Sequence, residues 1–129
     1  MDISEFYCGE KLYRAVKPME PFMSEDGTKI SSGAFTQPTH IKSGISVDKQ
    51  AHRDNKVAVD TIASSKIGYI VSITTDDCDE KNVDYEYCKT EENVYHSELY
   101  GNKQSQKYSL TKGQAKYMAR HCVIEMERK

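Results

Sequence analysis

Apolar and polar residues alternate in six short stretches of this chain, and a period of two is typical of half-buried strands. The stretch 66–74 gives the strongest signal, because small or apolar side chains occupy both of its faces. Burial on both faces indicates a central strand with helix on at least one side. Six strands are predicted, at residues 12–16, 45–48, 66–74, 83–88, 94–100 and 122–126.

Two other stretches have the pattern of helices. Residues 49–64 are predicted to be helical after a polar start, with Asp54 as a cap or first-turn acid. A second helix is predicted over 112–121, where Thr111 supplies the cap and Gln114 stands at the capping-box position. The buried stripe of the first helix is predicted to come from the i, i+4 pairs Val57/Thr61 and Ala58/Ile62.

Turn residues separate these elements. Pro18 and Pro21 end the first strand, and 25–27 reads as a turn. Residues 31–35 (SSGAF) read as a corner leading into a strand, and the acidic run 76–80 as a solvated turn without the spacing of a calcium loop. We therefore expect one α+β domain over residues 1–129, with a mixed or mostly antiparallel sheet of five to six strands and two main helices.

Composition narrows the class of protein. The chain has 129 residues and a formal charge of −2, which argues against a general nucleic-acid coat, although a local basic patch would still allow nucleic-acid binding. No apolar run approaches the ~18 residues of a membrane span, and the acidic N-terminus lacks a signal-peptide core, so a cytoplasmic protein is expected. The four cysteines fit no zinc spacing and are expected to be reduced thiols, with no metal bound.

Five residues are candidates for chemistry. Arg14 lies amid strand residues, where it either pairs with a carboxylate at the surface or clamps a phosphate. Ser31 and Ser32 either form a plain corner or let the backbone approach a ligand closely. His96 and Glu98 fall on one face of a strand. They are either polar residues on a solvent-exposed face, or a base and a charge-stabilising group in one cleft.

The order of these residues resembles the Arg–Ser–Glu order of ADP-ribosyltransferases. The Leu12-Tyr13-Arg14 strand in particular is similar to the start of small RES-type bacterial toxin domains that degrade NAD. The resemblance implies that Arg14 holds the NAD phosphates and that Ser31 or Ser32 orders the nicotinamide ribose. It also implies that Glu98 bonds the ribose hydroxyl, while His96 stands where many members carry Gln or Glu.

Two functions remain open on the sequence. The first is an NAD-binding, ADP-ribosyltransferase-like or NAD-degrading enzyme, with NAD as its substrate. The second is a non-catalytic module that binds a partner protein or a nucleic acid, since tyrosine is favoured at interfaces. The residues that suggest this module are Tyr85, Tyr87, Tyr95, Tyr100, Tyr108 and Tyr117. A metal-independent ribonuclease that uses His96 and Arg14 is a third, weaker reading.

Overall fold

A computed structural model describes residues 2–17, 22–23, 29–38, 41–64 and 68–127. It contains one six-stranded antiparallel sheet, which confirms the predicted α+β class. The strands are β1 (Lys11–Val16), β2 (Ile45–Lys49), β3 (Tyr69–Thr74), β4 (Asp84–Tyr87), β5 (His96–Tyr100) and β6 (Val123–Met126), and their order in the sheet is β4-β5-β2-β1-β3-β6. The helices are the 3-10 helix η1 (Ser32–Phe35) and the α-helices α1 (Asn55–Ala63), α2 (Thr75–Glu80) and α3 (Lys112–His121).

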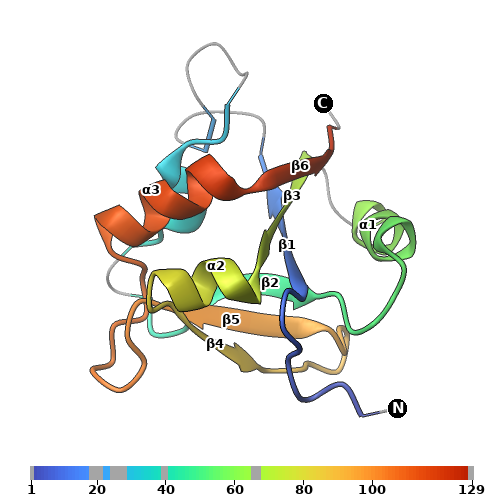
Figure 1. Ribbon diagram of the computed structural model, residues 1–129, viewed down its shortest axis with the longest axis horizontal. Helices are drawn as coiled ribbons and strands as arrows, with labels where there is room; N and C mark the ends of the chain where they lie inside the picture. Colours follow the sequence, from blue (N-terminus) through green and yellow to red (C-terminus); the bar gives the residue numbers. More distant parts are fainter. Residues whose placement is uncertain (1, 18–21, 24–28, 39–40, 65–67, 128–129) are drawn as a thin grey trace.

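The sheet consists of two halves that run in different directions. Strands β1 and β3, with β6 paired to β3, form one half, and β2, β5 and β4 form the other and cross β1 and β3 steeply (Figure 1). Within the first half β1 pairs with β3 over all six of its residues. Between the halves the register of β1 and β2 holds only Leu12 with Lys49 and Tyr13 with Asp48. The two central strands therefore separate after Tyr13, and we call this place the divergence point.

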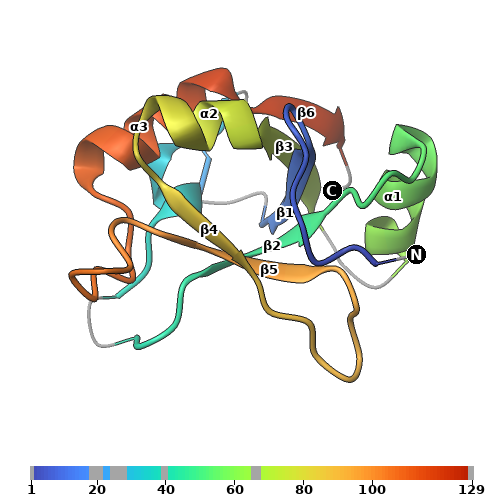
Figure 2. The same cartoon turned by 60° about the horizontal axis from the view of Figure 1, so that its bottom comes forward.

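Helices cover the sheet unevenly. Helices α2 and α3 lie on one side of it, and α1 lies apart from them beside β1 and β3 (Figures 1 and 2). The main core lies under α2, α3 and η1, and its largest contributions from the central strands are Leu12, Ile73 and Leu99. A smaller cluster joins α1 to Tyr13 and Ile70 on the opposite face. Among the described elements no helix covers that opposite face of β4, β5 and β2 (Figure 2).

The two long helices have the N-terminal caps that the sequence predicts. Asp54 caps α1 by accepting the Lys56 amide, and Thr111 forms the predicted capping box with Gln114 at the start of α3. Helix α1 begins at Asn55 rather than near residue 49, because Lys49 still belongs to β2. The predicted stripe of α1 was wrong for the pair Val57/Thr61, because both residues are exposed. Its buried residues are Ala58, Val59, Ile62 and Ala63.

Two predicted loops are short helices. Residues 76–80 were predicted as a turn, but Thr75–Glu80 form α2, because Thr74 and Asp77 make a capping box and Cys78 is buried in the core. The expected corner at 31–35 is η1, which packs its buried Ala34 and Phe35 against α3. Pro18, Pro21 and the turn at 25–27 lie outside the described residues. The described part of the chain contains no helix long and apolar enough to cross a membrane.

Candidate functional site

The carboxylate of Glu98 is bound on both of its oxygens by neighbouring residues. Oε1 accepts the backbone N–H of Gly44 at 3.0 Å and the hydroxyl of Tyr100 at 2.9 Å. Oε2 lies 3.1 Å from Nε2 of His96. His96, Glu98 and Tyr100 alternate along β5, so their side chains share one face as the period of two requires. The result is a cradle that fixes the orientation of one carboxylate.

This carboxylate is neither deeply buried nor fully open. The side chains of Glu98 and His96 keep 17% and 18% of their exposure, so a ligand can reach them. Burial raises the pKa of Glu98, but the hydrogen bonds from His96, Gly44 and Tyr100 outweigh it, so the pKa lies below its ordinary value. Glu98 is therefore ionised at neutral pH and carries a fixed negative charge.

Gly44 is required for the cradle because no larger residue fits. A Cβ on Gly44 would lie 2.6 Å from the carbonyl oxygen of Leu99 and 2.9 Å from the Cβ of Glu98. It would also lie 2.9 Å from Cε1 of Tyr100. Only glycine lets the backbone approach β5 closely enough for its N–H to bind the carboxylate.

Arg14 lies at the divergence point. Its Nε donates to the carbonyl oxygen of Ala34 in η1 at 2.6 Å, and its NH1 group donates to the carbonyl oxygen of Ser46 in β2 at 2.8 Å. Burial lowers the pKa of Arg14 to about 10, so the guanidinium keeps its charge at neutral pH. Arg14 leaves β1 on the core face, and it reaches β2 because the two strands no longer pair there.

The side chains of Arg14 and Glu98 leave the sheet on opposite faces. Arg14 shares the face of Leu12 and Val16, which belong to the main core, whereas Glu98 lies on the uncovered face, since its neighbour Leu99 faces the core.

Along β2 the backbone N–H and C=O groups point alternately to β5 and to β1. The amide of Lys49 donates towards β5, so every second residue counted from Lys49 points to β5, and the residues between them point to β1. Ser46, whose carbonyl oxygen binds Arg14, is of the second kind.

The structure places the other predicted residues less centrally. Ser31 caps η1, where its hydroxyl accepts the Gly33 amide, and Ser32 is the first residue of η1. Both serines belong to the segment that binds Arg14 through Ala34, and no described contact joins either one to Glu98. Ser46 is instead the Cα partner of Glu98 across the β2–β5 ladder, and it is exposed.

Sequence reasoning did not assign Ser46 or Gly44 to the site, and it assigned Tyr100 to a binding surface instead. Tyr100 follows Glu98 at the same two-residue spacing as His96 precedes it, so the strand period alone could have placed its ring on the same face. Gly44 and Ser46 carry a weaker signal. Gly44 is a glycine directly before a short strand, and Ser46 is a small polar residue on the solvent-exposed face of that strand. Their role depends on the divergence of β1 and β2, which is a tertiary feature.

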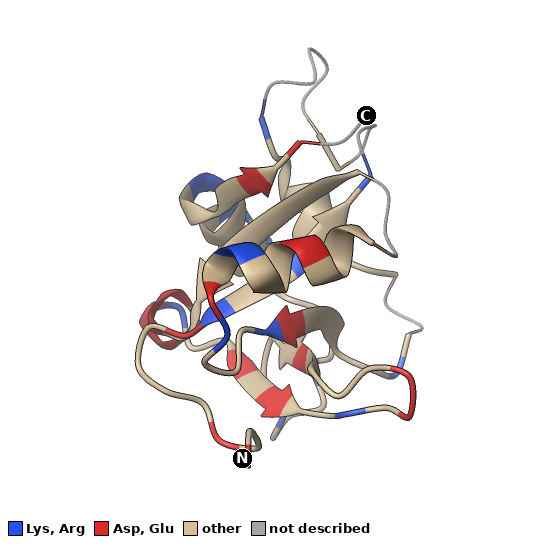
Figure 3. Cartoon of the chain, turned by 90° about the vertical axis from the view of Figure 1, so that its right-hand side faces the viewer, with Lys and Arg blue, Asp and Glu red and all other residues tan. Residues whose placement is uncertain are grey.

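Acidic positions lie on all three strands of the uncovered face (Figure 3). Glu86 on β4 is the direct Cα partner of Glu98, and like charges placed opposite each other destabilise a sheet. The ammonium of Lys103 offsets this repulsion by forming an ion pair with Glu86, and Nε2 of His96 contacts Glu98. The Lys103–Glu86 pair is about half exposed and therefore weak.

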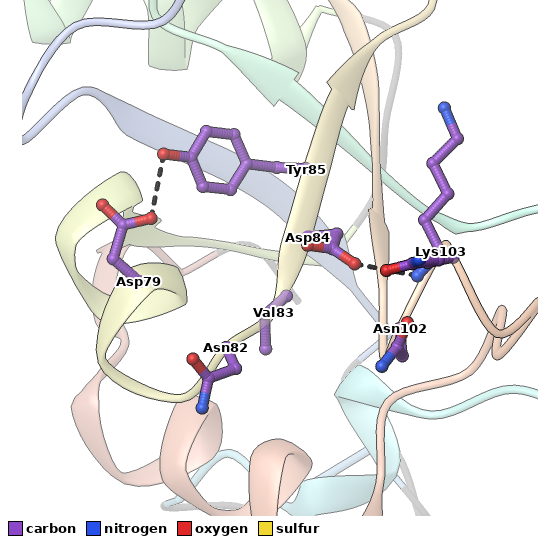
Figure 4. Close-up of a pocket in the computed structure, with 8 residues that line it drawn as sticks. Asp79, Asn82, Val83, Asp84, Tyr85, Asn102 and Lys103 are labelled. Carbon is purple, nitrogen blue, oxygen red and sulfur yellow. Dashed lines mark hydrogen bonds between the residues drawn. The ribbon is translucent and has the colours of Figure 1, made fainter.

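A hollow of about 840 Å³ lies between the end of α2 and the turn after β5 (Figure 4). Its carboxylates have partners within the protein: Asp79 accepts the Tyr85 hydroxyl at 3.0 Å, and Asp84 accepts the Lys103 amide at 2.8 Å. Small-molecule sites are usually lined by apolar side chains. This hollow is lined by Asp79, Asn82, Val83, Asp84, Tyr85, Asn102, Lys103 and Gln104, which makes it the poorer candidate.

Histidines and cysteines form no metal-binding group within the residues that the structure describes. His52 stacks on Tyr7 and His121 stacks on Tyr117, with ring centroids about 4 Å apart in both pairs. The four cysteines are free thiols, of which Cys78 is buried and Cys8 is exposed.

The tyrosines that suggested a binding surface are spread over several elements. Tyr85 meets Phe6 edge to face, Tyr87 donates to a backbone carbonyl, and Tyr100 is buried. Each of these three tyrosines makes contacts within the protein or is buried in it, and these contacts do not join them into one surface patch.

The chain was compared with protein-family models, with curated proteins and with solved structures, and none of the three comparisons gave a match.

Proposed function

We propose that this protein binds NAD and breaks the bond between nicotinamide and ribose, either transferring the ADP-ribose to an acceptor or releasing it to water. The observation that carries this proposal is the partly exposed carboxylate of Glu98, which the amide of Gly44, the hydroxyl of Tyr100 and the imidazole of His96 hold in one orientation. The resemblance of the Arg14 strand to ADP-ribosyltransferases is consistent with it.

The two charged groups suit the two ends of the reacting half of NAD. A guanidinium presents parallel N–H groups that match the oxygens of a pyrophosphate. When the C–N bond breaks, its electron pair leaves with nicotinamide and positive charge develops on the ribose. An ionised carboxylate fixed in a cradle stabilises that charge without reorganising.

The serine in this arrangement would be Ser46 rather than Ser31 or Ser32. Ser46 is exposed, it is the Cα partner of Glu98 across the β2–β5 ladder, and its carbonyl oxygen binds Arg14. Ser31 and Ser32 would act through η1, whose Ala34 carbonyl holds the guanidinium. His96, next to Oε2, would take the proton of the incoming water or acceptor.

The test is to incubate the purified protein with NAD and to measure free nicotinamide by chromatography. Glu98→Gln is expected to lower the rate by about 100-fold or more, as the loss of one preorganised charge stabiliser does. Glu86→Gln is the matched control, because Glu86 is the direct neighbour of Glu98 but pairs with Lys103. A rate that is unchanged by Glu98→Gln, or the absence of both turnover and NAD binding, would contradict the proposal.

A further inference from the structure

We infer that Tyr100 is a positioning residue, which holds one oxygen of Glu98 so that the other is directed at the ligand. The inference rests on the proposed function for its catalytic consequence, but the positioning itself can be tested without NAD.

The two oxygens of Glu98 have different surroundings. Oε1 accepts two hydrogen bonds, from the hydroxyl of Tyr100 and the amide of Gly44. These donors come from within the fold, since Tyr100 and Gly44 are both buried. Oε2 contacts the imidazole of His96, which is part of the accessible face. Oε1 is therefore the anchored oxygen, and Oε2 is the one that can face a developing positive charge.

The ring of Tyr100 is itself held in place. It keeps only 6% of its exposure, and the ring of Tyr108 meets it edge to face with centroids 6.3 Å apart. The ammonium of Lys103 lies 5.5 Å from the ring centroid. A phenol confined in this way offers its hydroxyl from one fixed direction, which is what a preorganised site needs.

The last torsion of a glutamate side chain is soft, with broad and roughly two-fold preferences. Without the phenol hydroxyl, Oε1 would keep only the Gly44 amide, and the carboxylate plane could rotate. Rotation would misdirect Oε2 while leaving the charge in place. The chemical step would therefore slow, whereas NAD held by Arg14 would bind as before.

The experiment is Tyr100→Phe, which removes the hydroxyl and keeps the ring. The expected result is a fall in kcat of about tenfold at unchanged KM for NAD. By carbon NMR of the labelled carboxyl, the pKa of Glu98 is expected to rise, because one of the hydrogen bonds that lower it is lost. Tyr85→Phe is the matched control, since it removes another tyrosine–carboxylate hydrogen bond, to Asp79, away from Glu98.

The outcomes separate this inference from the proposed function. If the wild-type protein does not cleave NAD, a rise in the Glu98 pKa in Tyr100→Phe still supports the positioning role, and the NAD proposal alone fails. A Glu98 pKa unchanged by Tyr100→Phe overturns the inference, whether or not NAD is cleaved. An equal fall in kcat for Tyr85→Phe also overturns it, because the effect would then be a general loss of structure.

Discussion

The ammonium of Lys49 lies 3.9 Å from the carboxylate of Glu10, and both side chains are completely buried. Lys49 also donates to the carbonyl oxygens of Ile3 and Glu5, the second at 2.8 Å, while Glu10 accepts the amide of Ala51 at 2.8 Å. The pair therefore ties the N-terminal segment to the end of β2, the strand whose other end binds both Arg14 and Glu98.

Replacing one member of this pair is expected to destabilise the protein strongly. Lys49→Met keeps much of the side-chain volume but leaves the carboxylate of Glu10 buried without its counter-charge. The expected loss is about 3–5 kcal/mol in the free energy of unfolding, measured by urea titration. Adding Glu10→Gln should recover part of that loss, because the uncompensated charge is then removed. A single variant within about 0.5 kcal/mol of wild type would show that the pair carries no stability.

Gly44 is expected to tolerate no side chain. In Gly44→Ala the new Cβ would meet backbone and side-chain atoms of β5 at 2.6–2.9 Å, so the start of β2 must shift. A loss of about 1–3 kcal/mol in unfolding free energy is expected, as for overpacking elsewhere. Because the shift moves the amide that binds Glu98, NAD cleavage should fall as well.

Gly113→Ala is the control for that variant. Nothing lies within 4 Å of a Cβ built on Gly113, and this residue is in the exposed first turn of α3. The change should stabilise the protein by about 0.5–1 kcal/mol through helix propensity. Similar effects for the two glycines would mean that the crowding at Gly44 does not constrain the site.

The fold followed from the sequence where local pattern decides it. The alternation in β3 predicted a strand buried on both faces, and Thr111 with Gln114 predicted the start of α3. The pattern failed at 76–80, because the charged residues there indicated a solvated turn. These residues form a helix, which its capping box and one buried cysteine, Cys78, stabilise. The pattern also failed at 31–35, where packing against α3 selects a 3-10 turn over an extended corner.

The candidate site was less predictable, for a physical reason. His96 and Glu98 share a face because of the strand period, and a sequence shows that period directly. Arg14 lies on the other face of the sheet and binds the carbonyl oxygens of Ala34 and Ser46, and this depends on the register of β1 against β2, which no local pattern states. Tyr100 was assigned to a binding surface because a sequence does not show that its hydroxyl turns inward to Glu98.

Acid is expected to weaken the anchoring of the last strand. Glu125 in β6 is bound by Lys11 at 2.8 Å, by Ser72 at 2.6 Å and by Asn55 at 3.1 Å. Burial raises the pKa of Glu125, but these bonds outweigh it and leave the pKa below its ordinary value. Because the folded pKa is depressed, the stability it gives is complete above about pH 5 and is lost as pH falls through the folded pKa.

Glu125→Gln tests this linkage by removing the ionisable group. At neutral pH the variant should lose about 1–2 kcal/mol of unfolding free energy, and its stability should fall less than that of wild type as the pH is lowered. Glu91→Gln, in an exposed turn, is the control and should follow the wild-type curve. Parallel curves for Glu125→Gln and wild type would show that Glu125 contributes nothing to the acid sensitivity.

Arg14 is expected to bind ligand in addition to stabilising the fold, and Arg14→Lys separates the two roles. An ammonium cannot bind the Ala34 and Ser46 carbonyls in the fixed fork of a guanidinium, so unfolding free energy should fall by about 1–2 kcal/mol. If the guanidinium also binds the pyrophosphate, the Kd for NAD measured by calorimetry should rise about tenfold or more. Arg53→Lys is the matched control, because Arg53 also donates to two backbone carbonyls, those of Gln50 and Lys49, at the other end of β2. Both variants should lose similar stability, but only Arg14→Lys should lose NAD affinity.

Equal affinities for NAD in the two variants would contradict the binding role. Arg14 would then be a structural residue, whose buried guanidinium only joins η1 to β2.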